Sequence, residues 1–155
     1  MVQNRSFQPL AVELDEGVSV NPLDQLLGYQ LRRASQAMMA DLEERLTNFG
    51  LRITEASVLL VIEANPNITQ SEIGRVLSIQ RANMAPLTTQ LERGGLIQRT
   101  AAGGRAQALR LTKAGMALAR ECRACTALNE ARFLPKLDET KRAALIEQIR
   151  LIWDK

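Results

Sequence analysis

The sequence predicts a mainly α-helical protein with one small β-hairpin, and three observations carry this prediction. Long segments near both ends of the chain repeat apolar residues at helical spacing. Near the centre, two shorter helical segments are separated by a tight turn. Two short extended segments follow, joined by a tip that contains Gly103 and Gly104. This order is that of a winged helix-turn-helix between long flanking helices.

The amino-acid composition already excludes some classes of function, before any motif is considered. The chain has 155 residues, enough for one domain with a sizeable core, and only 3% are aromatic, so aliphatic side chains must build that core. Neither a bilayer-spanning run nor a signal peptide is evident, and a cytoplasmic protein is expected. Histidine is absent, which removes the commonest general base and the commonest metal ligand. We therefore expect neither an enzyme nor a cofactor.

The N-terminal part is expected to be a flexible arm, residues 1–21, followed by a long helix. Asn21 is the expected cap of a helix that begins at Pro22 or Leu23 and ends at Thr47. Its apolar stripe consists of Leu23, Leu26, Leu27, Leu31, Ala34, Met38, Leu42 and Leu46. A second helix is expected to open at Thr54 and to stop at Asn65-Pro66. Its apolar run from Val58 to Ile62 predicts a position at the centre of the domain.

The helix-turn-helix is expected to begin at a capping box, in which Thr69 caps the helix and Glu72 reaches back. That short helix ends at about Leu77, and a tight turn leads to a second helix at residues 81–93. Pro86 lies inside this second helix. Its missing N–H leaves the carbonyl of Ala82 without its usual donor and predicts a local bend.

The hairpin is expected to pair residues 96–100 with residues 107–111. Thr112 then caps a helix at 113–133, and Asp138 caps the last helix at 139–153. The expected organisation is a DNA-binding region at 54–111 and a helical dimerisation region at 22–53 and 112–155. A twofold dimer is the simplest way to cover the long apolar stripes.

Charge is unevenly distributed along the chain and favours a polyanionic partner. Between Arg75 and Lys113 seven Lys or Arg residues stand against one acid, Glu92, although the whole chain carries only +3. A local charge of +6 on a helix-turn-helix and hairpin indicates DNA binding.

Several segments resemble the MarR family of bacterial transcription regulators. The resemblance covers roughly residues 22–153, and its order and spacing are more specific than any single piece. The matching pieces are Ile68-Thr69-Gln70-Ser71-Glu72-Ile73, Arg81-Ala82-Asn83-Met84, Leu91-Glu92-Arg93-Gly94-Gly95-Leu96-Ile97 and Leu111-Thr112-Lys113-Ala114-Gly115.

This resemblance implies a homodimer that binds double-stranded DNA, most often a repressor released by a small-molecule effector. The second helix of each helix-turn-helix, called the recognition helix and expected at residues 81–93, then enters the major groove, and the two copies use successive grooves of a pseudo-palindromic operator. The hairpin, called the wing, touches the minor groove. The expected DNA-binding residues are Thr69, Ser71, Gln80, Arg81, Asn83 and Arg105. Arg81 suits phosphate or guanine, Asn83 suits adenine, and Arg105 at the hairpin tip suits a narrow minor groove. The wing is about one residue shorter than the family pattern, with Gly103-Gly104-Arg105 where an Asp-Arg-Arg run is usual.

Effector binding has one candidate cluster, formed by Tyr29, Arg32 and Arg33 on the first helix. A phenol and guanidinium groups can recognise the carboxylate or phosphate of an aromatic acid or thioester of the kind that the family binds. Alternatively, the tyrosine lies at the edge of the core and the arginines form surface ion pairs.

Two other interpretations keep the fold and change the function. Cys122 and Cys125 form a Cys-x-x-Cys pair that could act as a redox or metal switch, although two small apolar residues packed along a helix explain it better. The shortened wing would also be consistent with a protein–protein interaction module that has lost DNA binding.

Overall fold

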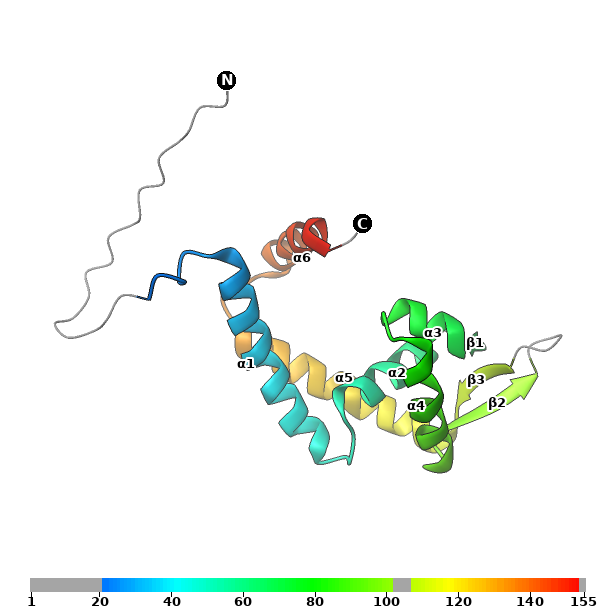
Figure 1. Cartoon of the computed structure of the whole chain (residues 1–155). Helices are drawn as coiled ribbons and strands as arrows, with labels where there is room; N and C mark the ends of the chain where they lie inside the picture. The colour runs from blue at the N-terminus through cyan, green and yellow to red at the C-terminus, as the bar shows by residue number, and fades with distance from the viewer. Residues whose placement is uncertain (1–20, 102–106, 154–155) are drawn as a thin grey trace, which may run out of the picture. The chain divides into compact units, whose positions relative to one another are not determined.

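The structure is a computed structural model that describes residues 21–101 and 107–153. Its elements, shown in Figure 1, are α1 (Leu27–Thr47), α2 (Ile53–Ala64), β1 (Ile68–Thr69), α3 (Gln70–Val76), α4 (Arg81–Arg93), β2 (Ile97–Ala101), β3 (Gln107–Leu111), α5 (Lys113–Phe133) and α6 (Glu139–Trp153). The mainly α-helical fold class with a small hairpin is confirmed. The chain divides into two compact units, one ending at Ala37 and one beginning at Met38, and each is described by itself.

In the first unit, α1 begins at Leu27, so the predicted start at Pro22 or Leu23 was wrong. The side chain of Asn21 accepts a hydrogen bond from the backbone N–H of Leu23 at 3.1 Å, and its carbonyl accepts one from Asp24 at 3.2 Å. Asn21 therefore stabilises a separate turn rather than the first turn of the long helix. Asn side chains form hydrogen bonds with nearby backbone groups, and these bonds favour turns over helices.

In the second unit, α2 is the centre of the core, as its apolar run predicted. Val58, Leu59 and Ile62 are each at most 1% exposed. The helix begins at Ile53, one residue before the predicted Thr54, because the Glu55 carboxylate accepts the N–H of Arg52 at 2.7 Å. A Glu three residues after the cap satisfies a backbone donor even where the cap itself is not Ser or Thr.

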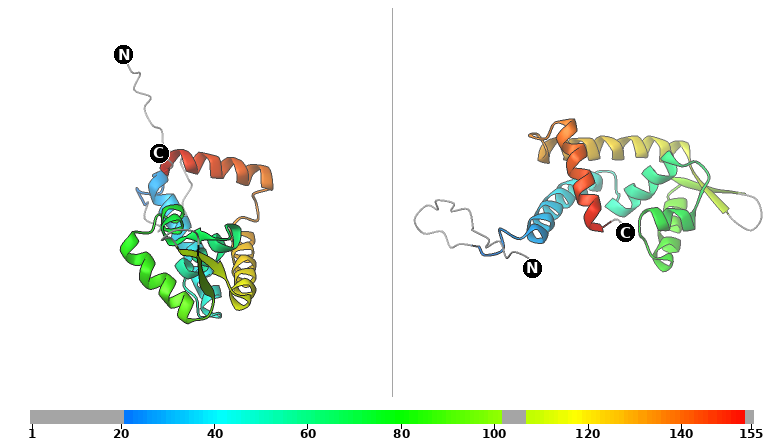
Figure 2. Two further views of the ribbon diagram at one scale, coloured as in Figure 1. Left: turned by 90° about the vertical axis from the view of Figure 1, so that its right-hand side faces the viewer. Right: turned by 90° about the horizontal axis from the view of Figure 1, so that it is seen from above.

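The sheet has three antiparallel strands in the order β1-β3-β2 rather than the two strands predicted. Strand β1 is only two residues long and pairs Ile68 with Leu109 and Thr69 with Ala108. Such a short segment has no alternation by which a sequence can reveal it. The hairpin pairs Ile97 with Leu111, so β2 begins one residue after the predicted Leu96. Figure 2 shows the hairpin beside α3 and α4.

The hairpin is joined to α5 by a close backbone contact at Gly115. The Thr112 hydroxyl caps α5 by accepting the Gly115 N–H at 3.0 Å and donates to the Gly95 carbonyl at 2.6 Å. A Cβ at Gly115 would overlap the carbonyl oxygen of Leu96, so only glycine fits. The first turn of α5 is thereby packed directly onto the start of β2.

A buried acid, Asp41, joins the C-terminal half of α1 to α5. It accepts hydrogen bonds from Arg45 at 2.6 Å and from Asn129 at 3.0 Å, and it also pairs with Arg132. The hydrogen bond from Arg45, followed by that from Asn129, lowers the pKa of Asp41 to about 2, although burial opposes this change. Asp41 is therefore ionised across the physiological range, and its buried charge has partners.

Helix α6 buries none of residues 139–153. Its exposed apolar side chains are Leu145, Ile146, Leu151, Ile152 and Trp153. Among the described residues, no helix combines the length and apolarity needed to cross a membrane.

We predict that Gly115→Ala lowers the free energy of unfolding by about 3 kcal/mol, because the new methyl group forces α5 away from β2. Gly94→Ala is the matched control: Gly94 has a φ of −71° and its nearest neighbour would lie at an ordinary 3.4 Å from the new Cβ. Urea denaturation monitored by circular dichroism measures both. Equal stability of the two variants would contradict the proposed contact.

Candidate nucleic-acid interface

The angle between α3 and α4 is set by close packing at the turn that joins them. Thr69 and Glu72 form the predicted capping box, with the Thr69 N–H donating to the Glu72 carboxylate at 2.8 Å. A Cβ at Gly74 would lie 3.1 Å from the Ile79 carbonyl oxygen and 3.2 Å from the Met84 side chain. Ser78 has a φ of +53°, which turns the chain sharply between the helices. The two helices are thus held at one fixed crossing.

Helix α4 is anchored by one face. Met84, Thr88 and Leu91 are at most 2% exposed. The Thr88 hydroxyl lies 3.0 Å from the Met84 carbonyl and 3.1 Å from the side-chain oxygen of Gln70 on α3. At the other end, the Gln90 amide donates to Glu55 of α2 at 2.6 Å. These bonds fix the rotation of α4 about its own axis and so decide which side chains face outward.

The helix runs through Pro86 without ending and starts at Arg81, as predicted.

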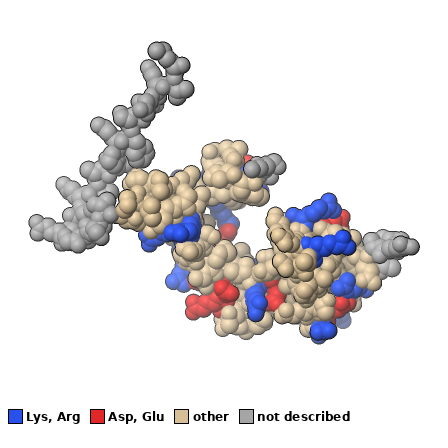
Figure 3. All heavy atoms as spheres, in the orientation of Figure 1, with Lys and Arg blue, Asp and Glu red and all other residues tan. Residues whose placement is uncertain are grey.

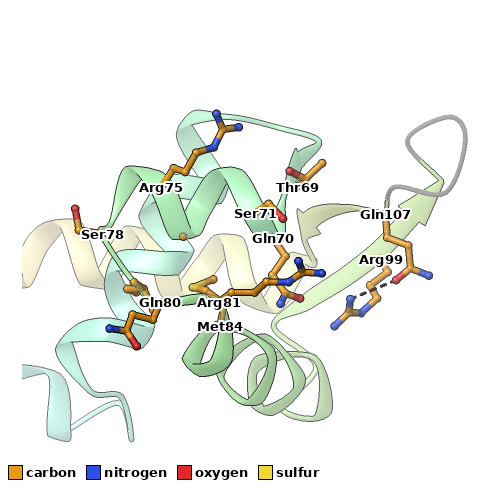
Figure 4. A pocket seen from close by; sticks show the side chains of 12 residues that line it. Thr69, Gln70, Ser71, Arg75, Ser78, Gln80, Arg81, Met84, Arg99 and Gln107 are labelled. Carbon is orange, nitrogen blue, oxygen red and sulfur yellow. Dashed lines mark hydrogen bonds between the residues drawn. The ribbon is translucent and has the colours of Figure 1, made fainter.

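A hollow of about 760 Å³ lies between α3, the N-terminal turn of α4 and the hairpin (Figure 4). Its lining comprises Thr69, Gln70, Ser71, Gly74, Arg75, Ser78, Ile79, Gln80, Arg81, Met84, Arg99 and Gln107. The Arg81 side chain extends across the hollow toward Gln70, below Ser71. Two helices and the hairpin thus contribute to a single concave surface, and most of the residues that line it have polar side chains.

Four of the six predicted DNA-binding residues line this hollow: Thr69, Ser71, Gln80 and Arg81. Asn83 lines a neighbouring hollow together with Gln80 and Thr54 of α2. Arg105 lies outside the described residues. The Thr69 hydroxyl donates to the Glu72 carboxylate at 2.7 Å, so this group already has a structural partner. Ser71 is exposed.

Sequence reasoning did not single out Gln70, Arg75, Arg99 and Gln107 as residues of this surface. Arg99 on β2 donates to Glu92 of α4 at 2.9 Å and to Gln107 of β3 at 3.3 Å. Glu92 is the one acid of the basic segment, and this pair ties the base of the hairpin to the end of α4. Arg99 lies two residues after the buried Ile97. This spacing predicts that Arg99 belongs to the surface only when the strand register is known.

Positive charge remains available on this surface. Within the described ranges, neither Arg75 nor Arg81 forms an ion pair. Figure 3 shows several Lys and Arg side chains exposed on the part of the surface formed by α3, α4 and the hairpin. Exposed guanidinium groups beside hydroxyl and amide side chains can hold phosphate oxygens and read base edges.

In the first unit, α1 brings Tyr29, Arg32 and Arg33 together. The guanidinium carbons lie 5.3 Å and 5.9 Å from the centre of the tyrosine ring, within cation–π range. The Tyr29 hydroxyl accepts a hydrogen bond from Asn21 at 3.0 Å. Both arginines are exposed, and neither is ion-paired within residues 21–101 and 107–153.

Cys122 and Cys125 are buried on α5, at 0% and 8% exposure, as expected for small packing residues. Burial raises the pKa of the Cys122 thiol to about 11, which keeps it protonated and poorly nucleophilic. No group of three or more potential ligands is placed to hold a metal ion in the described part of the chain. These observations give the redox or metal switch no support.

Comparisons with known proteins found one matching family model and several similar solved structures. The MarR family model matches residues 51–102, and no curated protein matches the chain significantly. The solved structure of the transcriptional repressor CouR bound to p-coumaroyl-CoA is 31% identical, covers 92% of this chain and 100% of its own, and has a TM-score of 0.74.

A second relative is the MarR-family protein Rv2887 of Mycobacterium tuberculosis. Its complex with salicylic acid is 26% identical over 83% of this chain and 97% of its own, with a TM-score of 0.64. Its complex with DNA covers 84% of this chain and 100% of its own at 24% identity, with a TM-score of 0.68. The chain described here belongs to the MarR family of transcriptional regulators.

Proposed function

We propose that this chain is a homodimeric, sequence-specific repressor that a small aromatic acid or its thioester releases from a pseudo-palindromic operator. One observation carries the proposal: the hollow that gathers Ser71, Arg75 and Arg81 beside the exposed N-terminal turn of α4. In a helix-turn-helix, the residues at the start of the second helix are those that reach base edges.

Each part of the surface has a role that follows from its chemistry. Arg81 offers two parallel N–H donors to guanine or one to phosphate, and Asn83 matches the donor–acceptor pair of adenine. Ser71 and Arg75, on the preceding helix, are proposed to contact phosphates and so to fix the register of the protein on the duplex. We further propose that Arg105 at the hairpin tip enters the minor groove. Thr69 supports this surface through its cap and Gln80 borders it.

The proposed dimer uses residues 22–53 and 112–155, with residues 54–111 as the DNA-binding region. Its support is the apolar surface near the chain ends. In the first unit Leu26 and Leu27 are more than half exposed, and in the second unit Leu151 and Trp153 of α6 are 78% and 64% exposed. Apolar patches of this kind mark association surfaces, and soluble proteins most often close them as twofold pairs.

The proposed effector contact is the Tyr29, Arg32 and Arg33 cluster of α1. Exposed guanidinium groups beside an aromatic ring suit a planar aromatic carboxylate, which can stack and be paired at the same time. The relatives support this chemical class, since CouR was solved with p-coumaroyl-CoA and Rv2887 with salicylic acid.

We predict that Arg81→Ala weakens operator binding by about tenfold to a hundredfold, as expected for the loss of a bidentate base contact. The operator is obtained by selection from random duplex DNA, and affinity is measured by fluorescence anisotropy over a series of salt concentrations. Asn83→Ala should weaken binding to the same degree and relax specificity at an adenine.

The matched control is Lys136→Ala, which removes one positive charge from an exposed position after α5. It should leave affinity within about twofold of the wild type, because one distant charge is screened. Every variant must sediment as the wild type does. Wild-type affinity of Arg81→Ala would overturn the assignment, and failure to select any sequence would overturn the proposed function.

We also predict that salicylate or p-coumaroyl-CoA raises the thermal midpoint of the protein and lowers its affinity for the operator, since binding to two linked sites is reciprocal. Arg32→Ala should reduce both effects, whereas Arg120→Ala, an exposed arginine of α5, should not. If these ligands stabilise Arg32→Ala as well as they stabilise the wild type, Arg32 is not part of the effector site.

A further inference from the structure

The outward face of α4 has an apolar centre. Residues 81–83, 85 and 86 in the first two turns are exposed, and of these Ala82 and Pro86 lie opposite the buried Met84, Thr88 and Leu91, one helical turn apart. Neither side chain carries a hydrogen-bond donor or acceptor. The rotation of the helix is fixed by the contacts of Thr88 and Gln90, so this face cannot turn toward the core.

Polar side chains flank this centre instead of occupying it. Arg81 extends into the hollow beside α3 and the hairpin (Figure 4), and Asn83 lies on the side of α4 that faces Thr54. A helix in the major groove would therefore place polar groups along its two sides and an apolar strip against the base edges between them.

The major groove offers one apolar group, the 5-methyl of thymine, while the other base edges present hydrogen-bonding atoms. An apolar strip pressed against those polar edges would leave them without partners, at a free-energy cost. We infer that Ala82 and Pro86 read thymine 5-methyl groups in each half-site. This inference rests on the proposed function, because it names the sequence class that the same surface recognises.

The spacing of the two residues agrees with two neighbouring contacts. Four residues of α-helix rise about 6 Å. Successive bases of one strand lie about 3.4 Å apart along the duplex, so the helix spacing corresponds to one or two steps, according to the angle between α4 and the duplex axis. The alanine side chain is also short enough for the helix backbone to lie close to the base edges. We therefore expect two contacted thymines in each half-site, at positions one or two base steps apart.

The test replaces thymine by deoxyuridine in the selected operator, one position at a time, which removes only the methyl group. Binding of the full-length wild-type protein should weaken by about fourfold at each thymine contacted, the effect expected for one buried methyl group. The protein is unchanged in this comparison, so no loss of folding can imitate the result.

A variant assigns the contact to a residue. Ala82→Gly should abolish the difference between thymine and deoxyuridine at one position, whereas Ala117→Gly on the exposed side of α5 should preserve it. Because the comparison is a ratio of two affinities, the lower helix propensity of glycine cancels.

Deoxyuridine operators that bind as tightly as thymine operators, or selected half-sites without thymine, would overturn this inference and leave the proposed function standing. A thymine preference that Ala82→Gly does not alter would overturn the assignment to Ala82. Failure to select any operator would overturn both proposals, so the two failures are distinguishable.

Discussion

Burial of Met84, Thr88 and Leu91 on one side of α4 is the constraint on which the rest of the surface depends. Once these side chains are inside, helical geometry leaves Ala82, Pro86 and their polar neighbours outside. The bonds from Thr88 to Gln70 and from Gln90 to Glu55 then connect this helix to α3 and α2. The face proposed to bind DNA is therefore a direct consequence of core packing.

The second important joint is the backbone contact between α5 and β2. Gly115 lies against Leu96, and Thr112 bonds to both Gly95 and Gly115. This contact packs the first turn of α5 against the base of the hairpin. Asp41 in turn connects α5 to the C-terminal half of α1. The described contacts thus connect the C-terminal half of α1, through α5, to the base of the hairpin.

Most of the helices and the hairpin could be predicted from the sequence because their signals are local. The capping residues Thr69, Thr112 and Asp138 act within one turn, and the apolar run of α2 is continuous. Strand β1 could not be predicted, because two residues form a strand only when β3 is beside them. The start of α1 was predicted wrongly for a similar reason. Asn21 can cap a long helix or stabilise a short turn, and only the three-dimensional structure shows that it stabilises the turn.

The candidate surface was predictable in part for similar reasons. Arg81 and Asn83 stand at a helix start that the sequence marks, whereas the contribution of Arg99 and Gln107 depends on strand pairing. The most direct test of the proposed DNA-binding surface is a structure of the full-length protein bound to its selected operator. We expect α4 in the major groove, with Arg81 and Asn83 hydrogen-bonded to base edges or phosphates and the Ala82 methyl against a thymine methyl. A complex in which α4 lies outside the groove, or in which its buried face has rotated toward the DNA, would contradict it.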